Sequence, residues 1–301
     1  MPELPDLEYI RPILAKKLIG QTLIGLEVFE PVILRNMLGA PLDNLQSQVL
    51  DVRRHGPFIW ILLDELETRN ASADSNHSKI ELDSRESQAA IVIHPMLAGR
   101  FRLNGKRQSS TAIRFRFFDY HLDYLDDRKM GKVFVCRSDG LDQIPGFRKQ
   151  GMDVLSADFS LDLFQKLAAK SRKQVRVFIM DQSLISSIGN AYADEILFEA
   201  GLHPKTRMNQ LSQQNREKLY ESIQTVLRAG MHTIQEAKPD LELKYRDHMK
   251  VRNKKDQPCP RCGNRIRRAN VLGYDSFFCP VCQPDGGRGF IDWNSLAENK
   301  P

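Results

Sequence analysis

Cys259-Pro260-Arg261-Cys262 and Cys279-Pro280-Val281-Cys282 are two C-x2-C pairs, separated by sixteen residues, near the end of a chain of 301 residues. This spacing is typical of two knuckles on a β-hairpin whose four thiolates close a tetrahedral Zn²⁺ shell, with no open position for chemistry. The sequence therefore predicts one structural zinc ion, and catalysis must come from other residues. Two disulfides are the alternative, which fits poorly with an intracellular chain. We expect the fifth cysteine, Cys136, to be buried in packing.

Basic residues are concentrated just before and within this cysteine segment. Ten Lys and Arg lie from Lys244 to Arg268, against only Asp247 and Asp256, in a chain of formal net charge +6 and pI about 9.0. Such a density fits contact with phosphates, and a solvated surface run is the alternative. Between the two cysteine pairs, Arg267 is a candidate contact to a nucleic-acid backbone.

Upstream of the cysteines the chain has a β-rich first half and a helical second half. Short stretches rich in β-branched and aromatic residues predict strands, and after about Ser156 the apolar period becomes helical. We place the domain boundary near 146–156, and the polar stretch 65–87 predicts a mobile loop. The predicted strands are 22–29, 58–63, 89–94, 113–118 and 132–136, and the predicted helices are 161–167, 175–180, 191–200 and a longer one from about 212.

The first residues contain a candidate covalent catalyst. Removal of Met1 would leave a free secondary amine on Pro2 beside the carboxylate of Glu3. An α-amine has a pKa of about 8, so a useful fraction is nucleophilic at neutral pH, and its attack on a sugar carbon gives an iminium ion that eases elimination. Glu3 is then the natural proton donor. The alternative is an ordinary start that caps the helix predicted from the apolar repeat at positions 7, 10, 14 and 18.

No stretch approaches the apolar length of a membrane span, and the N-terminus has no apolar signal core. We therefore expect a soluble, intracellular protein without a membrane partner. Its location would be the cytoplasm or nucleoid of a bacterium, or the nucleus of a eukaryote.

Together these features resemble the formamidopyrimidine-DNA glycosylase and endonuclease VIII family over nearly the whole chain. The resemblance is carried by Pro2-Glu3-Leu4-Pro5-Asp6-Leu7-Glu8, by the stretch 181–204 with its Gly189-Asn190-Ala191-Tyr192, and by the cysteine quartet followed by Gln283. It implies an α+β fold with a β-sandwich domain at 1–150, a helix-two-turns-helix domain at 151–250, a zinc finger at 251–285 and a tail at 286–301. The two domains would flank a DNA-binding cleft.

The resemblance also implies a function. Such enzymes are base-excision-repair DNA glycosylases with AP lyase activity, which remove oxidised bases and nick the strand by β-elimination, and often δ-elimination. By position, Pro2 resembles the Schiff-base nucleophile and Glu3 the general acid that opens the deoxyribose ring. The expected partner is double-stranded DNA containing damaged bases or abasic sites, and we expect a monomer because one enzyme can span a single lesion.

DNA contacts are implied in the same way. The loops 94–99 and 126–131 correspond to the family loops that fill the gap left by an extruded base, with Leu97 and Met130 as apolar wedges and Arg128 on the orphaned base. Core packing is the alternative for both wedges. Asn190 resembles the asparagine that binds phosphate beside the lesion, with a helix cap as the alternative. The candidate DNA-binding residues are Leu97, Arg128, Lys129, Met130, Arg172, Arg176, Asn190 and Arg267, of which Arg172 and Arg176 could instead belong to a solvated helix face.

Two positions depart from the family pattern. Bacterial members commonly have a lysine in the hairpin that here reads Arg54-His55-Gly56-Pro57-Phe58, and a proline cannot transfer a proton. We expect Arg53, Arg54 or His55 to substitute. The family arginine five residues before the third cysteine is here Tyr274, which Arg267 or Arg268 would compensate. The stretch 233–249 is compact and lacks glycine, which argues against strict 8-oxoguanine specificity.

Three functions remain open at this point. The leading hypothesis is a bifunctional DNA glycosylase and AP lyase, based on Pro2, Glu3, Asn190 and the cysteines. A catalytically impaired paralogue that binds damaged or distorted DNA is favoured by Pro57 and Tyr274. A zinc-ribbon scaffold that binds protein or RNA has only the cysteine quartet behind it and leaves the N-terminus unexplained.

Overall fold

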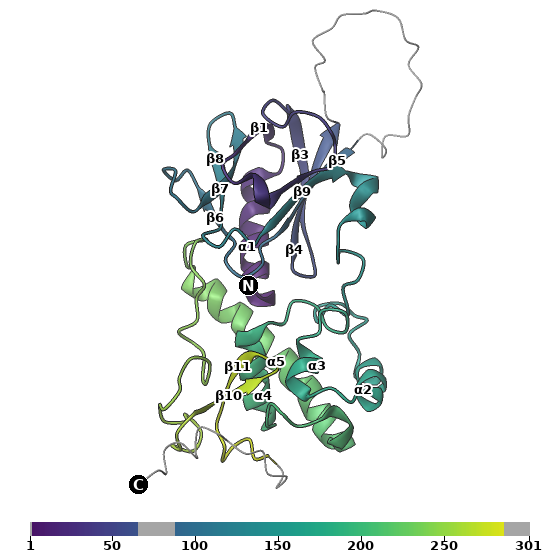
Figure 1. Cartoon of the computed structure of the whole chain (residues 1–301), viewed down its shortest axis with the longest axis vertical. Helices are drawn as coiled ribbons and strands as arrows, with labels where there is room; N and C mark the ends of the chain where they lie inside the picture. Colours follow the sequence, from purple (N-terminus) through teal and green to yellow (C-terminus); the bar gives the residue numbers. More distant parts are fainter. Residues whose placement is uncertain (1, 66–87, 286–301) are drawn as a thin grey trace, which may run out of the picture. The chain divides into compact units, whose positions relative to one another are not determined.

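The computed structural model describes residues 2–65 and 88–285 (Figure 1). The chain forms two compact units, the first from 1–150 and 234–245 and the second from 151–233 and 246–301. The return of 234–245 to the first unit was not predicted. Nearly all of the predicted polar loop, from residue 66, and the predicted tail from 286 lie outside the described residues.

The first unit begins with helix α1 (Leu4–Leu18), which starts directly after Pro2 and Glu3 as the apolar repeat predicts. Leu7, Leu14 and Leu18 are fully buried on one face of this helix. Pro12 lies within α1 and does not end it. The helix packs against the largest cluster of buried residues in this unit.

The strands of the first unit form two halves, in which neighbouring strands are antiparallel except for β2, which pairs in parallel with β9. Only two residue pairs, Thr22↔Gln48 and Leu23↔Ser47, join β1 to β3, and the hydrogen-bonded order is β2-β9-β5-β4-β3-β1-β7-β8-β6. One core contains residues of both halves, such as Ile91 and Phe115, which confirms the α+β fold with a sandwich-like N-terminal domain. The strands are β1 (Thr22–Val28), β2 (Leu34–Asn36), β3 (Ser47–His55), β4 (Phe58–Glu65), β5 (Gln88–His94), β6 (Arg100–Leu103), β7 (Thr111–Phe117), β8 (His121–Leu125) and β9 (Lys132–Arg137).

Four of these strands, β2, β3, β6 and β8, were not predicted from the sequence, because charged residues interrupt their apolar pattern. In β8 the central Asp123 is fully buried, a position where propensity alone predicts no strand. Cys136 on β9 is buried, as expected, and burial raises the pKa of its thiol to about 11.

The second unit is helical and ends in a β-hairpin. Its elements are α2 (Leu161–Lys170), α3 (Val175–Ile179), α4 (Asn190–Ala200), α5 (Gln213–Ala237, whose last four residues belong to the first unit), β10 (Arg267–Val271) and β11 (Tyr274–Phe278). Helix α4 is buried along most of its length and ends at Gly201, whose φ of +70° suits glycine. The apolar cluster of Phe198, Val251, Ile266 and Phe277 packs the hairpin onto α4. None of the described helices is long and apolar enough to cross a membrane.

Candidate functional site

Pro2 and Glu3 precede α1, so the candidate nucleophile and acid lie at the N-terminal end of a helix. Both residues are buried, and the backbone N–H of Glu3 donates to Asp6 Oδ2 at 2.8 Å. This hydrogen bond fixes how the chain enters the helix. While Met1 is attached, the Pro2 nitrogen belongs to a peptide bond and is not nucleophilic, so the candidate chemistry requires that Met1 be removed.

The turn between β3 and β4 explains how Pro57 is accommodated. Gly56 and Pro57 form a two-residue hairpin turn, in which Gly56 has φ +52° and a Cβ would lie 2.6 Å from the Gln150 side chain. A proline as the second turn residue is compatible with this geometry because its φ is fixed near −65°. Pro57 is buried and offers no titratable group.

The three expected substitutes for a proton carrier differ in their surroundings. Arg53 pairs with Asp51 at 2.6 Å, and Arg54 pairs with Glu8 of α1. His55 Nε2 lies 2.8 Å from the carbonyl oxygen of Phe147. A ring nitrogen facing a carbonyl must carry the proton, so the neutral His55 has its lone pair on Nδ1. Of the three side chains, His55 alone offers a nitrogen lone pair, because a guanidinium has only donors.

A hydrogen bond between His94 and Met96 shapes the loop after β5. Burial lowers the pKa of His94 to about 4, and its Nδ1 accepts a hydrogen bond from the Met96 N–H at 3.1 Å, as a neutral ring can. Met96 has a left-handed φ of +47°. Leu97, the first wedge candidate, is 44% exposed, so it is not a core residue.

The loop after β8 is organised by the buried carboxylate of Asp126. It accepts from the N–H groups of Arg128 at 3.0 Å and Gly131 at 2.6 Å. Arg128 is exposed, Lys129 pairs with Glu30 at 2.8 Å, and Met130 is 37% exposed, which also argues against a core role.

One buried tyrosine brings these two loops together. A Cβ on Gly99 would lie 2.4 Å from the Tyr124 hydroxyl, and a Cβ on Gly131 would lie 2.0 Å from it. Both loops therefore approach Tyr124 so closely that only glycine fits. The structure thus places the two wedge candidates on loops that share one support.

A cavity of about 390 Å³ lies beside these loops, and residues 242–244, which return to the first unit after α5, form part of its lining. No feature of the segment 234–245 predicts this return from the sequence. The cavity is lined by Leu97, Ala98, Arg100, Asp127, Arg128, Glu242, Leu243 and Lys244. The segment is held by the Tyr9 hydroxyl, which donates to the Pro239 carbonyl at 2.8 Å, and by Lys244 Nζ on the Leu97 carbonyl.

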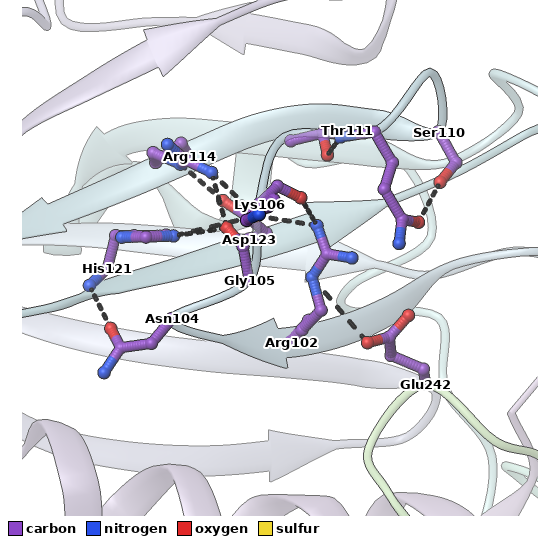
Figure 2. Close-up of polar contacts among 11 residues, drawn as sticks. Arg102, Asn104, Gly105, Lys106, Ser110, Thr111, Arg114, His121, Asp123 and Glu242 are labelled. Carbon is purple, nitrogen blue, oxygen red and sulfur yellow. Dashed lines mark hydrogen bonds and ion pairs between the residues drawn. The ribbon is translucent and has the colours of Figure 1, made fainter.

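Glu242 of the same segment joins a buried ion cluster on β6, β7 and β8 (Figure 2). Arg114 donates to both oxygens of Asp123, at 2.7 and 3.1 Å, and Arg102 donates to Asp123 Oδ2 at 3.2 Å. Arg102 also forms an ion pair with Glu242 at 3.7 Å, and Arg114 donates to the carbonyl of Gly105 at 3.0 Å. Two arginines therefore meet two carboxylates, and hydrogen bonding to Asp123 raises the pKa of Arg114.

In the second unit, Asn190 opens α4 and is fixed by Arg176. The Arg176 side chain is 1% exposed, donates to Asn190 Oδ1 at 2.7 Å and to Asp194 Oδ1 at 3.1 Å. Asn190 caps no N–H of α4 with its side chain among the contacts of the described residues. Arg176 is thus no solvated helix residue, and it has little surface left for a ligand.

The remaining candidates differ in exposure. Arg172 is exposed, with its carbonyl accepting from Arg207, and Arg267 is half-buried on β10 opposite Phe278. Tyr274 begins β11 and is 58% exposed. Arg268 pairs with the Asp275 carboxylate at 3.5 Å, which leaves it less available as a substitute cation.

Arg252 was not among the predicted site residues. Its guanidinium pairs with Asp194 at 2.8 Å, beside Arg176. The signal that could have pointed to it is the pair Asp194 and Glu195 within the mostly apolar helix α4, because buried carboxylates require partners. The sequence could not say which of the ten basic residues from 244 to 268 supplies them.

The four cysteines gather as the spacing predicts. Their Sγ atoms all lie within 4.8 Å of one another, with Cys259 and Cys282 3.9 Å apart and Cys262 and Cys279 3.5 Å apart. Thiolates around a tetrahedral Zn²⁺ at about 2.3 Å are separated by about 3.8 Å, so the donor set and its dimensions fit zinc. None of the four is in a disulfide.

Three family descriptions match consecutive parts of the chain. Residues 1–133 match the formamidopyrimidine-DNA glycosylase N-terminal domain, and residues 150–238 match the H2TH domain of the same family. Residues 256–284 match the zinc finger found in FPG and IleRS.

Individual proteins are similar over almost the full length. A formamidopyrimidine-DNA glycosylase of Synechococcus sp. is 30% identical over 304 residues, covering 94% of this chain and 99% of its own. One of Lactococcus lactis subsp. lactis is 27% identical over 293 residues, with the same coverage. A solved complex of Lactococcus lactis Fpg with DNA containing an abasic site is 25% identical, covers 94% of this chain and 100% of its own, and has a TM-score of 0.77. A complex of that enzyme with N7-benzyl-Fapy-dG DNA has the same identity and coverage and a TM-score of 0.78.

Proposed function

Because the chain belongs to the formamidopyrimidine-DNA glycosylase family, whose members are DNA N-glycosylases with AP lyase activity, we propose that it removes oxidised bases from double-stranded DNA through a Schiff base on Pro2 and nicks the strand by β-elimination. The observation that carries this proposal is the pair Pro2 and Glu3 at the start of α1 in a chain of this family. The secondary amine of the processed chain attacks C1′, the base leaves, and the resulting iminium makes the C2′ proton acidic.

Glu3 acts as the general acid that protonates the ring oxygen as the deoxyribose opens. Proton transfer by a positioned carboxylic acid contributes about 10²- to 10⁴-fold to such a step. His55 is the candidate to move the protons of the elimination, since its Nδ1 lone pair faces no donor among the described residues. Pro57 has no such group.

The DNA contacts of the proposal follow from exposure and charge. Leu97 and Met130 fill the gap left by the extruded base, Arg128 contacts the orphaned base, and Lys129, Arg172, Arg267 and Asn190 contact phosphates. Arg176 has a different role, because it holds the Asn190 side chain. One Zn²⁺ on Cys259, Cys262, Cys279 and Cys282 closes the hairpin that carries Arg267.

We expect the protein to act as a monomer. The relatives named above come from bacteria, which supports the cytoplasm and nucleoid over the nucleus as its location.

A test of the chemistry uses a duplex with one abasic site and borohydride, which reduces a Schiff base to a stable adduct. The processed wild type should form a covalent complex that mass spectrometry maps to Pro2. Pro2→Gly should lose it, Glu3→Gln should slow strand scission by about 100-fold or more, and Pro5→Ala is the matched control. A wild type that traps no DNA across a panel of lesions, or that retains Met1, contradicts the proposal.

The second candidate is a paralogue that binds distorted DNA without turnover. Pro57 and the exposed Tyr274 favour it, because both replace side chains that the family commonly uses. It predicts tight, salt-dependent binding of lesion duplexes and no product. Strand scission by the purified wild type that is lost in Glu3→Gln excludes it.

A further inference from the structure

The side-chain amide of Asn190 is held in one orientation by Arg176. Arg176 can only donate hydrogen bonds, so the end of the amide that it meets at 2.7 Å is Oδ1. Nδ2 is therefore the opposite end of the same planar group. Within residues 2–65 and 88–285, no acceptor meets Nδ2.

Arg252 is fixed through its backbone. Glu195, buried in α4, accepts from the N–H of Lys250 at 2.7 Å and from those of Val251 and Arg252 at 2.9 Å each. Burial raises the pKa of Glu195, and these three hydrogen bonds oppose that shift. The carboxylate thus holds the short stretch from which the Arg252 side chain starts.

The guanidinium of Arg252 is fixed as well. Nη1 donates to Asp194 Oδ2 at 2.8 Å and to the carbonyl of Asp275 at 3.0 Å, and it approaches the carbonyl of Asn190 at 3.5 Å. The group also lies over the ring of Phe277, 5.1 Å from its centre. A side chain held in this way loses little conformational entropy when it binds a ligand.

All three polar contacts of Arg252 use Nη1. No described residue accepts from its Nε or Nη2, and the side chain keeps 19% of its surface. Arg176 and Arg252 share the single carboxylate of Asp194. The two nearby acidic residues do not pair with them through a carboxylate: Glu195 binds backbone N–H groups, and Asp275 accepts from both arginines only through its backbone carbonyl. The positive charge of this pair is therefore only partly compensated.

We propose that Arg252 and Asn190 form a phosphate-binding site, in which the Nε and Nη2 edge of Arg252 binds two phosphate oxygens and Asn190 Nδ2 donates to the same group. A planar guanidinium edge matches the geometry of two phosphate oxygens. The ligand is a backbone phosphate of duplex DNA, so this inference rests on the proposed function. In this site the cation, Arg252, comes from the loop after α5. The hairpin does not supply it, because the exposed Tyr274 is uncharged.

The test measures DNA affinity against salt for the full chain and a duplex with a tetrahydrofuran abasic analogue. Arg252→Gln should bind about 10- to 100-fold more weakly, because a charge-assisted hydrogen bond is lost. The slope of log K against log salt should fall by about 0.9, the value for one phosphate. Arg252→Lys keeps the charge without the planar edge, so it should keep the slope and lose part of the affinity.

Arg114→Gln is the matched control. Arg114 also pairs with a buried aspartate and has 18% of its side-chain surface exposed, close to the 19% of Arg252. It should keep the wild-type slope. Thermal unfolding and zinc content of each variant show that it is folded.

The contacted phosphate is located with neutral methylphosphonate linkages, introduced one at a time around the lesion. At one linkage the wild type should lose affinity while Arg252→Gln loses nothing further. A folded Arg252→Gln with wild-type slope, or equal losses for both proteins at every linkage, overturns the inference. Base excision by the wild type is scored separately: excision without the Arg252 effect refutes this inference alone, and the Arg252 effect without excision refutes the proposed activity alone.

Discussion

Two buried aspartates in this molecule are each shared by two arginines, yet the two clusters differ in their charge balance. In the first unit, Arg102 and Arg114 meet Asp123 and a second carboxylate, Glu242 (Figure 2). In the second unit, two arginines meet Asp194 alone. Exposure does not separate them, since the Arg114 and Arg252 side chains are 18% and 19% exposed.

The difference lies in which donors each guanidinium uses. Arg114 donates hydrogen bonds from two nitrogens, Nε and Nη2, whereas Arg252 uses Nη1 alone. Arg102 donates from Nη2 alone, and its buried Nε has no hydrogen-bond partner among the described residues, although it lies 3.7 Å from Glu242 Oε1.

The Asp123 cluster, whose charges are compensated, holds strands β6, β7 and β8 and the segment 234–245 together. The Asp194 cluster, whose positive charge is only partly compensated, keeps donors that can bind an anion. For Arg114 and Arg252, which are almost equally exposed, the number of engaged donors is therefore a better guide to a binding role than burial.

Removal of zinc should separate the two clusters most strongly. Metal binding contributes about 10 to 16 kcal/mol to small zinc fingers. The hairpin it closes supplies the Asp275 carbonyl and the Ser276 hydroxyl, which donates to Asp194 at 2.7 Å. A chelator or Cys279→Ser should thus unfold the hairpin, abolish tight DNA binding and leave the first unit folded. Hydrogen exchange resolved by peptide measures both units, and protection lost equally around Asp123 contradicts the prediction.

Asp123→Asn and Asp194→Asn should each destabilise their own unit by about 3 to 5 kcal/mol, because an amide nitrogen would face buried guanidinium groups. Urea unfolding monitored in each unit measures the loss. The two variants should differ in DNA binding at temperatures where both are folded.

Asp194→Asn should weaken lesion binding, since it releases the side chains of Arg176 and Arg252. Asp123→Asn should keep the wild-type salt slope. An equal loss of slope in both variants would mean that the contrast between the clusters has no bearing on DNA.

Acid should destabilise the first unit more than the second. His94 has a folded pKa of about 4, lowered mainly by burial, against about 6.5 when unfolded. Between these values the unfolded chain binds a proton that the folded chain does not, so stability falls as the pH drops from 6.5 to 4, by up to about 3 kcal/mol.

His203 of the second unit has the same lowered pKa, again from burial, but Glu195 acts in the opposite direction. Because burial raises the pKa of Glu195 in the folded protein, the contribution of Glu195 to stability increases as the pH falls through this raised pKa. His94→Gln, whose amide can accept the Met96 hydrogen bond, should remove the slope of the first unit between pH 4 and 6.5. Unchanged pH dependence in that variant disproves the assignment.

Glu242→Gln should have the smallest effect. The Arg102 ion pair is 3.7 Å long and partly exposed, so its loss should change stability by no more than about 1 kcal/mol. In this variant the Asp123 cluster has two arginines and one carboxylate, as the Asp194 cluster has. The variant's salt slope for DNA should nonetheless stay at the wild-type value, because Arg102 and Arg114 still donate to Asp123 and to the backbone carbonyls of Lys106 and Gly105. A steeper slope would show that charge ratio, rather than donor use, makes a phosphate site.

Spacing and local pattern were enough to predict several features of this protein from its sequence. The two C-x2-C pairs specify their own cluster, the repeat from Leu7 to Leu18 specifies α1 behind Pro2 and Glu3, and the change of period near Ser156 separates the strands from the helices. Glycines at the ends of two loops marked where the wedge candidates lie. These signals are short-range, so they can be read without knowing the packing.

Which charges pair depends on how the whole chain packs. The tertiary structure buried Arg176 behind Asn190, chose Arg252 from a run of ten basic residues, and returned Glu242 to the strands that hold Asp123. A buried carboxylate requires partners, but a partner can lie far away in the sequence, as Arg252 lies 58 residues from Asp194. Which segments meet is set by how the apolar faces pack, and that information is not local in the sequence.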